Sequence, residues 1–167
     1  ISDPKLNSWI RSFRKPEKIL KKMLDEISAD YPEARNVDYS GVLSDSISLS
    51  TFHGCPKNEI EAIVRYLMTE HSMDVIVKFN PTVLGYAFVH KTLAEDLGYR
   101  HIKLDENAFL ADLSMSDAVA MMQRLSRFAK ERGRSLGAKF SNTLVVENQE
   151  LVFSQRQMYL SGTPLHV

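Results

Sequence analysis

The sequence predicts an α/β fold in which parallel strands alternate with helices, either as an open doubly wound sheet or as part of a TIM barrel, the (β/α)₈ fold. Residues 74–79 form a short β-branched run, which is typical of a strand buried in a parallel sheet. Similar runs recur between longer segments whose apolar residues follow helical spacing. This alternation produces right-handed βαβ units, in an open doubly wound sheet or in a barrel. No GxGxxG motif follows a predicted strand, so the dinucleotide-binding form of the open sheet has no support.

Residues 1–45 are predicted to be a helical segment that precedes the strand–helix units. Pro16 suits the first position of a helix, where its missing N–H costs nothing. An apolar stripe and a charged face then follow helical spacing until Tyr31 and Pro32. The stripe consists of Ile19, Leu20, Met23, Leu24 and Ile27.

Residues 46–167 are predicted to contain the repeated β/α units of a partial barrel, and a chain of 167 residues suits one structural domain. Residues 144–159 fit a long loop or a hairpin. A complete barrel typically needs about 250 residues, so we expect the middle of a barrel rather than a whole one. The predicted strands are residues 46–52, 74–79, 99–104 and 136–141, and the predicted helices are residues 59–67, 86–97 and 116–131.

The composition excludes several classes of protein. The 21 basic and 21 acidic side chains balance, so no general attraction to nucleic acid or to a membrane surface is expected. One cysteine allows neither an internal disulfide nor a cysteine-ligated cluster built by this chain alone. With no apolar run of membrane-spanning length and no leader-like start, we expect a cytoplasmic protein. The chain begins at Ile1 rather than Met, so we expect either a processed chain or a piece of a longer one.

Polar residues recur at the ends of the predicted strands. Three strands place a lysine two positions before a small polar residue, and residues two apart share one face of a strand. Because the carboxyl ends of barrel strands surround the active site, we expect these side chains to converge on one rim. The candidates are Thr51, His53, Cys55, Lys78, Asn80, Lys103, Asp105, Asn107, Lys139, Ser141, Asn142 and Thr143.

Simpler interpretations of these residues stay open. Lysines at strand ends often extend to solvent, and a free cysteine such as Cys55 is more often a small packed side chain than a nucleophile. His53 suits either a loop contact or a ligand contact. No third ligand accompanies His53 and Cys55 at a known spacing, so no metal is expected. The HExxH, Walker and GxSxG motifs are absent from the sequence.

Four segments in this order resemble the flavin barrel of the dihydroorotate and dihydropyrimidine dehydrogenase superfamily. They are residues 50–61, 77–85, 139–144 and 159–165. The chain is most similar to the barrel domain of large iron–sulfur flavoproteins that are related to the glutamate synthase small subunit and named as selenate reductase subunits. The resemblance covers residues 46–165.

The resemblance implies that FMN binds at the carboxyl-terminal mouth of the barrel. Lys78 corresponds to the strand-end lysine that contacts the flavin ring near N1 and O2, where a cation stabilises the reduced anion. The resemblance also implies cofactor contacts for Thr51 and Asn80, and flavin or substrate contacts for Asn142 and Thr143. It leaves His53, Cys55, Lys103, Asp105 and Lys139 as substrate or loop candidates.

The sequence departs from the family pattern at two points. The family's Asn-x-Ser-Cys-Pro is Thr-Phe-His-Gly-Cys-Pro here, and the loop with the catalytic Ser or Cys of the pyrimidine enzymes has no match. Pyrimidine chemistry is therefore not expected. Ser161-Gly162 resembles the start of the segment that leads to the phosphate site, whose loops would follow Val167, so we expect that this piece alone does not retain FMN.

These observations predict a fragment of a flavin-dependent oxidoreductase. It would pass electrons between FMN and 4Fe–4S clusters elsewhere in the parent protein. The expected partners are the remainder of that protein and, through open sheet edges, further copies of this chain. Two alternatives stay open: an enzyme that forms a Schiff base on Lys78, Lys103 or Lys139, and a non-catalytic barrel that serves as a scaffold.

Overall fold

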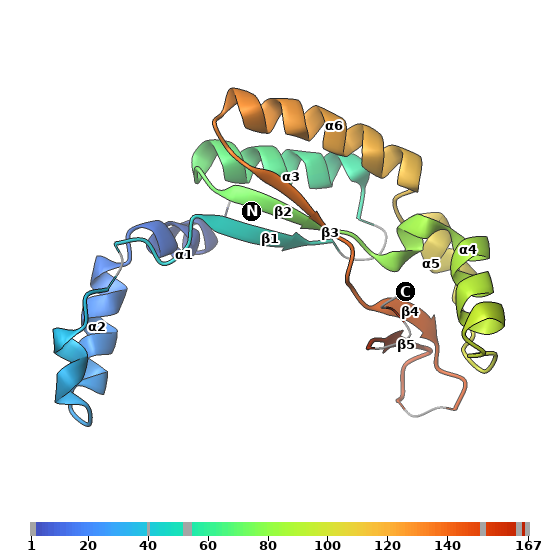
Figure 1. The fold of residues 1–167 in the computed structure, drawn as a ribbon, viewed down its shortest axis with the longest axis horizontal. Helices are drawn as coiled ribbons and strands as arrows, with labels where there is room; N and C mark the ends of the chain where they lie inside the picture. The colour runs from blue at the N-terminus through green and yellow to red at the C-terminus, as the bar shows by residue number, and fades with distance from the viewer. Residues whose placement is uncertain (1–2, 40, 52–54, 151–152, 163–164, 166–167) are drawn as a thin grey trace.

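The computed structural model describes residues 3–39, 41–51, 55–150, 153–162 and 165. A helical arm at the N-terminus leads to a parallel sheet with two covering helices. A smaller unit lies beyond the carboxyl ends of the strands (Figure 1). None of the described helices is long and apolar enough to cross a membrane.

The arm consists of helix α1 (Pro4–Arg14), helix α2 (Glu17–Ile27) and the 3₁₀ turn η1 (Pro32–Asn36). Asp3 caps α1 by accepting a hydrogen bond from the Leu6 N–H at 2.9 Å. The predicted helical segment of residues 1–45 contains α1, but the sequence analysis did not identify where this helix begins, although Asp3 and Pro4 are start signals. α2 lies where the apolar stripe predicts a helix, and none of its residues is buried.

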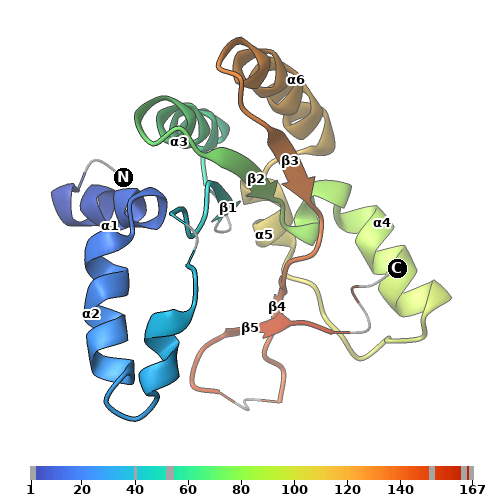
Figure 2. The same ribbon diagram turned by 60° about the vertical axis from the view of Figure 1, so that its left-hand side comes forward.

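Strands β1 (Ser46–Ser50), β2 (Asp74–Lys78) and β3 (Leu136–Lys139) form a parallel sheet in the order β1-β2-β3. Helices α3 (Lys57–Glu70) and α6 (Met115–Glu131) lie on the same side of this sheet (Figures 1 and 2). The side chains of β2 therefore alternate: Val75 and Val77 are buried beneath the helices, whereas Ile76 is 37% exposed on the opposite face. This arrangement confirms the predicted parallel α/β fold and is consistent with part of a barrel.

The main core fills the space between the sheet and the two helices. Val64 of α3 and Met121 and Leu125 of α6 are fully buried there. Full burial of each such side chain contributes about 1.5–3 kcal/mol. The core thereby fixes the strand ends against one layer of helices.

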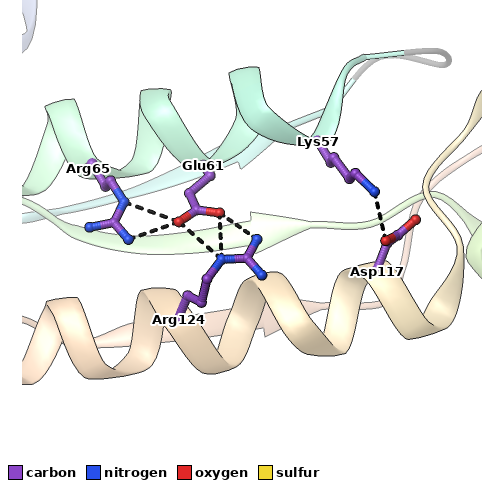
Figure 3. A network of polar contacts seen from close by, with 5 residues as sticks. All are labelled: Lys57, Glu61, Arg65, Asp117 and Arg124. Carbon is purple, nitrogen blue, oxygen red and sulfur yellow. Dashed lines mark hydrogen bonds and ion pairs between the residues drawn. The ribbon is translucent and has the colours of Figure 1, made fainter.

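Ion pairs along the outer surface join α3 to α6 (Figure 3). Glu61 accepts hydrogen bonds from Arg124 at 2.7 Å and from Arg65 at 2.8 Å, and Lys57 pairs with Asp117 at 2.8 Å. The Arg124 hydrogen bond holds the pKa of the Glu61 carboxyl below its ordinary value of 4.5. Because the basic partners are exposed, these pairs contribute little stability and serve mainly to align the helices.

The smaller unit packs an antiparallel hairpin against the helical segment that follows β2. The hairpin consists of β4 (Leu144–Glu147) and β5 (Gln157–Leu160). Of the two structures expected for residues 144–159, a long loop or a hairpin, the hairpin is the one found. A second apolar cluster, which includes Val89, Leu93, Leu144 and Val146, holds this unit together. The helical segment consists of η2 (Pro81–Leu84), α4 (Tyr86–His90), the π-helical turn η3 (Lys91–Asp96) and α5 (Glu106–Ala111).

The prediction of a third sheet strand at residues 99–104 is wrong. Only Leu104 forms a β-bridge, and that bridge is antiparallel and joins Val146 of β4. Ile102 and Leu104 enter the second apolar cluster instead. These alternating apolar side chains are buried against the hairpin rather than in the sheet. In the sheet, β3 therefore pairs directly with β2.

Candidate functional site

Three strands bring polar side chains to one edge of the sheet. Thr51 follows β1, Asn80 follows β2 and Asn142 follows β3, and all three strands end on the same side because they are parallel. The Thr51 hydroxyl donates to the Lys78 carbonyl at 3.1 Å, which joins the ends of β1 and β2. We call this group the rim: Thr51, Lys78, Asn80, Asn142 and Thr143, together with Thr82 and Asp112 described below.

A chain of hydrogen bonds orders the rim. Asn142 Nδ2 donates to Asn80 Oδ1 at 2.6 Å, and Asn80 Nδ2 donates to Asp112 Oδ2 at 3.1 Å. The Thr82 hydroxyl donates to the same Asp112 oxygen at 2.6 Å. Asn80 and Thr82 are buried, so these bonds satisfy polar groups that have little contact with water. Both ends of the Asn80 amide are thus used within the protein, which makes Asn80 a positioning residue.

The sequence analysis missed Asp112 and Thr82. Asp112 follows α5 rather than a strand, so a search of strand ends could not find it. Thr82 lies two residues after Asn80, in the 3₁₀ turn that begins at Pro81. The Asn-Pro-Thr sequence was the available local signal for a polar turn there.

Cys55 lies beside the rim as a packed thiol. Its side chain is 7% exposed and belongs to the main core. Burial, with smaller contributions from Glu59 and Asp112, raises the pKa of the Cys55 thiol above its ordinary value. The thiolate is therefore disfavoured, which agrees with a small packed side chain rather than a nucleophile.

Lys78 and Lys139 lie side by side at the ends of β2 and β3. They are register partners in the parallel pairing of β2 with β3. A backbone hydrogen bond from the Phe79 N–H to the Lys139 carbonyl at 2.9 Å joins the two strands at this level. Val77 and Ala138, their neighbours, face the helices, so the two lysines face the other side of the sheet. Neither ammonium group has a hydrogen-bond or ion-pair partner in the described part of the chain.

The predicted convergence of four strand ends is wrong for Lys103, Asp105 and Asn107. Lys103 pairs with Glu147 at 2.8 Å. Asp105 caps α5 through the Asn107 N–H and accepts a hydrogen bond from Gln157 of the hairpin. These groups belong to the smaller unit because residues 99–104 are not a strand of the sheet.

The remaining candidates lie as follows. Ser141 is exposed beyond β3, and the Asn142 side chain accepts a hydrogen bond from the Thr143 N–H at 2.9 Å. His53 lies outside the described residues. Within the described ranges, no group of three or more His, Cys, Asp or Glu side chains is placed to hold a metal ion.

An apolar pocket of about 240 Å³ opens beside Asn80, next to the rim. Leu84 and Phe88 line it from the segment after β2, and Phe140 lines it from the end of β3. Phe79 stacks on Phe140 at a centroid distance of 5.8 Å, which ties the pocket wall to the sheet. The site therefore combines cationic, amide and hydroxyl groups with an adjoining apolar surface.

Comparison with known proteins supports an oxidoreductase barrel. The family model described as "Oxidoreductase YgfK, N-terminal TIM-barrel domain" matches residues 3–167. Two curated proteins are similar, both named "Putative oxidoreductase YgfK", from Escherichia coli strain K12 and from Escherichia coli O157:H7.

Each relative is 43% identical over 119 residues, which cover 71% of this chain and 11% of the relative. The chain thus spans a small part of the length of these relatives. No solved structure matches the chain. The match over 3–167 and the parallel sheet agree, and this chain belongs to the family of N-terminal TIM-barrel domains of YgfK oxidoreductases.

Proposed function

We propose that this chain is a segment of an FMN-binding barrel in a longer oxidoreductase. The flavin would exchange electrons with 4Fe–4S clusters elsewhere in that protein and with a substrate. The observation that carries the proposal is the rim, where Lys78 presents an unpartnered ammonium group beside the ordered amides of Asn80 and Asn142 within the described structure.

The rim residues fit a flavin by the chemistry of their donors. The Lys78 ammonium can stabilise negative charge on a reduced ring, and the Thr143 hydroxyl and the second Nδ2 hydrogen of Asn142 can donate hydrogen bonds. Asn80 holds the Asn142 amide in place through the 2.6 Å hydrogen bond. FMN, when bound, supplies the two-electron and one-electron chemistry that these side chains do not possess.

The apolar pocket beside the rim adds support. Its lining by Leu84, Phe88 and Phe140 suits a planar aromatic ring, because such a ring gains from apolar burial while its polar edge meets donors. Asn80 forms part of the pocket wall, so the pocket adjoins the rim.

We expect the full-length protein to contain FMN and the Lys78→Met variant to have a more negative flavin midpoint potential. Loss of the cation should lower the potential by at least about 30 mV, which corresponds to about 1.4 kcal/mol for a two-electron couple. The measurements are extraction of the flavin and a spectroelectrochemical titration. Lys130→Met, on the exposed surface of α6, is the matched control.

A full-length protein without FMN would overturn the proposed function. An unchanged potential in Lys78→Met would remove Lys78 from the flavin site and leave the rest of the proposal standing.

The isolated 167-residue chain is expected to lose FMN and to self-associate. β1 and β3 are the outer strands of the sheet, and each has one edge unpaired among the described residues. Exposed edges favour strand pairing with other chains. Absorbance spectra and light scattering check both expectations. A yellow monomer with one flavin per chain would contradict them.

A further inference from the structure

We propose that helix α1 seats the strand–helix unit that closes the barrel of the longer protein, beside the free edge of β1. The inference rests on the barrel segment in the proposed function, and it does not depend on a flavin. The contact surface is an apolar row on α1, which we call the α1 seat: Leu6, Trp9 and Phe13.

Helix α1 is apolar on two sides. On one side, Ile10 belongs to the main core and Asn7 is buried as well. The α1 seat lies on another side, because its residues follow one another at helical spacing. Trp9 is 56% exposed, and its ring meets the Phe13 ring edge-on at a centroid distance of 4.7 Å. Since apolar sides of a helix are normally covered, we expect a second neighbour for α1.

The α1 seat is fixed near the amino end of β1 (Figure 1). The Phe13 carbonyl accepts a hydrogen bond from the Leu43 N–H at 2.8 Å, in the segment that leads into β1. A groove of about 220 Å³ lies between α1 and β1, and Trp9, Phe13 and residues 46–48 form part of its lining. The groove therefore presents aromatic side chains next to the start of an edge strand.

The occupant of this groove must supply both apolar surface and peptide groups. β1 pairs with β2 alone in the described sheet, so its outer edge has no strand partner among the described residues. Peptide groups that become buried need hydrogen-bond partners, which a lipid tail or an apolar small molecule does not offer. An extended strand offers them along the edge, and the helix connected to it can place apolar side chains against Trp9 and Phe13.

The barrel fold identifies this unit as part of the longer protein. The family match is to a TIM-barrel domain, and a (β/α)₈ barrel needs more strands than the three of the described sheet. The aligned residues make up 11% of each relative, so a protein of that length has ample chain for the other strands. A closed barrel leaves no free edge, and its last strand pairs with its first. Because β1 is the first strand of the described sheet, its free edge and the α1 seat would receive the closing unit.

The test is photo-crosslinking in the full-length protein, with the photoreactive residue p-benzoylphenylalanine in place of Trp9. Illumination should join position 9 to a strand–helix segment of the same molecule beyond residue 167, which peptide mass spectrometry identifies. The same probe in place of Ser8, an exposed residue of α1 outside the apolar row, is the matched control and should not form this cross-link.

A mixture of unlabelled and heavy-isotope-labelled protein separates the possible occupants. A cross-link between an unlabelled and a labelled molecule would mean that a second copy fills the groove, and it would overturn the inference. A cross-link confined to residues 1–167, a cross-link to a part of the molecule outside the barrel, or no cross-link at all would overturn it as well.

Amide hydrogen exchange in the full-length protein gives an independent readout. Trp9→Ala should accelerate exchange in β1 by at least about tenfold, because the closing strand loses part of its support. Trp9→Phe keeps an aromatic ring and should recover much of the protection, and Ser8→Ala should behave as the wild type does. The amides of α1 should stay protected in Trp9→Ala, since Ile10 and Asn7 still hold the helix to the core. Unchanged exchange in β1, or equal acceleration in α1 and β1, would overturn the inference.

The FMN content of the same preparations separates this inference from the proposed function. Protein that contains FMN but forms no cross-link from position 9 would overturn this inference alone. Protein that forms the cross-link without containing FMN would support the contact between α1 and the closing unit, while the proposed function fails.

Discussion

Replacing Asp112 with alanine is expected to release the rim and to open the segment after β2. In the wild type, Asn80 Nδ2 and the Thr82 hydroxyl both donate to the Asp112 carboxylate, and the variant removes this shared acceptor. Each buried donor left unsatisfied costs about 1–3 kcal/mol, so the local opening free energy should fall by about 3 kcal/mol. Amide hydrogen exchange in residues 79–85 of the full-length protein should accelerate by about two orders of magnitude.

Two further variants define the cause of this effect. Asp112→Asn keeps a carbonyl oxygen at the position and should recover much of the protection. Asp105→Ala removes a carboxylate that caps α5 in the other unit and should leave residues 79–85 unchanged. Wild-type exchange in Asp112→Ala would show that the hydrogen-bond chain does not hold the rim in place.

Replacing Asn7 with alanine is expected to detach α1 from α3. Asn7 Oδ1 accepts hydrogen bonds from the Tyr66 hydroxyl at 2.9 Å and from His71 Nε2 at 2.5 Å. Asn7 and His71 are buried, so the variant leaves buried donors unsatisfied and should cost about 2–3 kcal/mol. Urea titration of the isolated chain, followed by the emission of Trp9 in α1, measures the loss.

The controls for Asn7→Ala lie on the same helix. Ser8→Ala changes an exposed residue next to Asn7 and should leave the urea midpoint unchanged. Equal midpoints for Asn7→Ala and the wild type would mean that apolar contacts, such as those of Ile10 in the main core, hold α1 without the hydrogen bonds.

The same contact should make the docking of α1 depend on pH. Burial, with a smaller contribution from Arg11 and an opposing one from Glu70, holds the pKa of the His71 imidazole below its ordinary value of 6.5. His71 Nδ1 is buried without a hydrogen-bond partner among the described residues, so a proton there would find no acceptor. Folding therefore favours the neutral ring.

The sign of the effect follows from this preference. Below about pH 6.5 the unfolded chain takes up a proton that the folded chain resists, so stability is full above that pH and declines as the pH falls. The urea midpoint of the wild type should drop between about pH 7.5 and about pH 5.5, and His71→Gln should flatten this dependence. His90→Gln is the exposed control. A flat wild-type profile would contradict the prediction.

Local sequence patterns determined the class of the fold and part of the rim. Period-two alternation identified β1, and a β-branched run identified β2. Because the strands are parallel, their carboxyl ends lie at one edge of the sheet, regardless of the segments that connect them. This geometry is why Thr51, Asn80 and Asn142 could be grouped from the sequence alone. The resemblance to a flavin barrel supplied the chemistry proposed for them.

The tertiary structure decided which patterns belong to the sheet and which groups complete the rim. Residues 99–104 alternate as a strand does, but they pack on the β4–β5 hairpin, because alternation records only that one face is buried and not what buries it. Asp112 reaches the rim from the end of a helix, at a distance in sequence that no local rule connects to Asn80. The pairing of Lys78 with Lys139 likewise depends on strand register, which only the folded sheet sets.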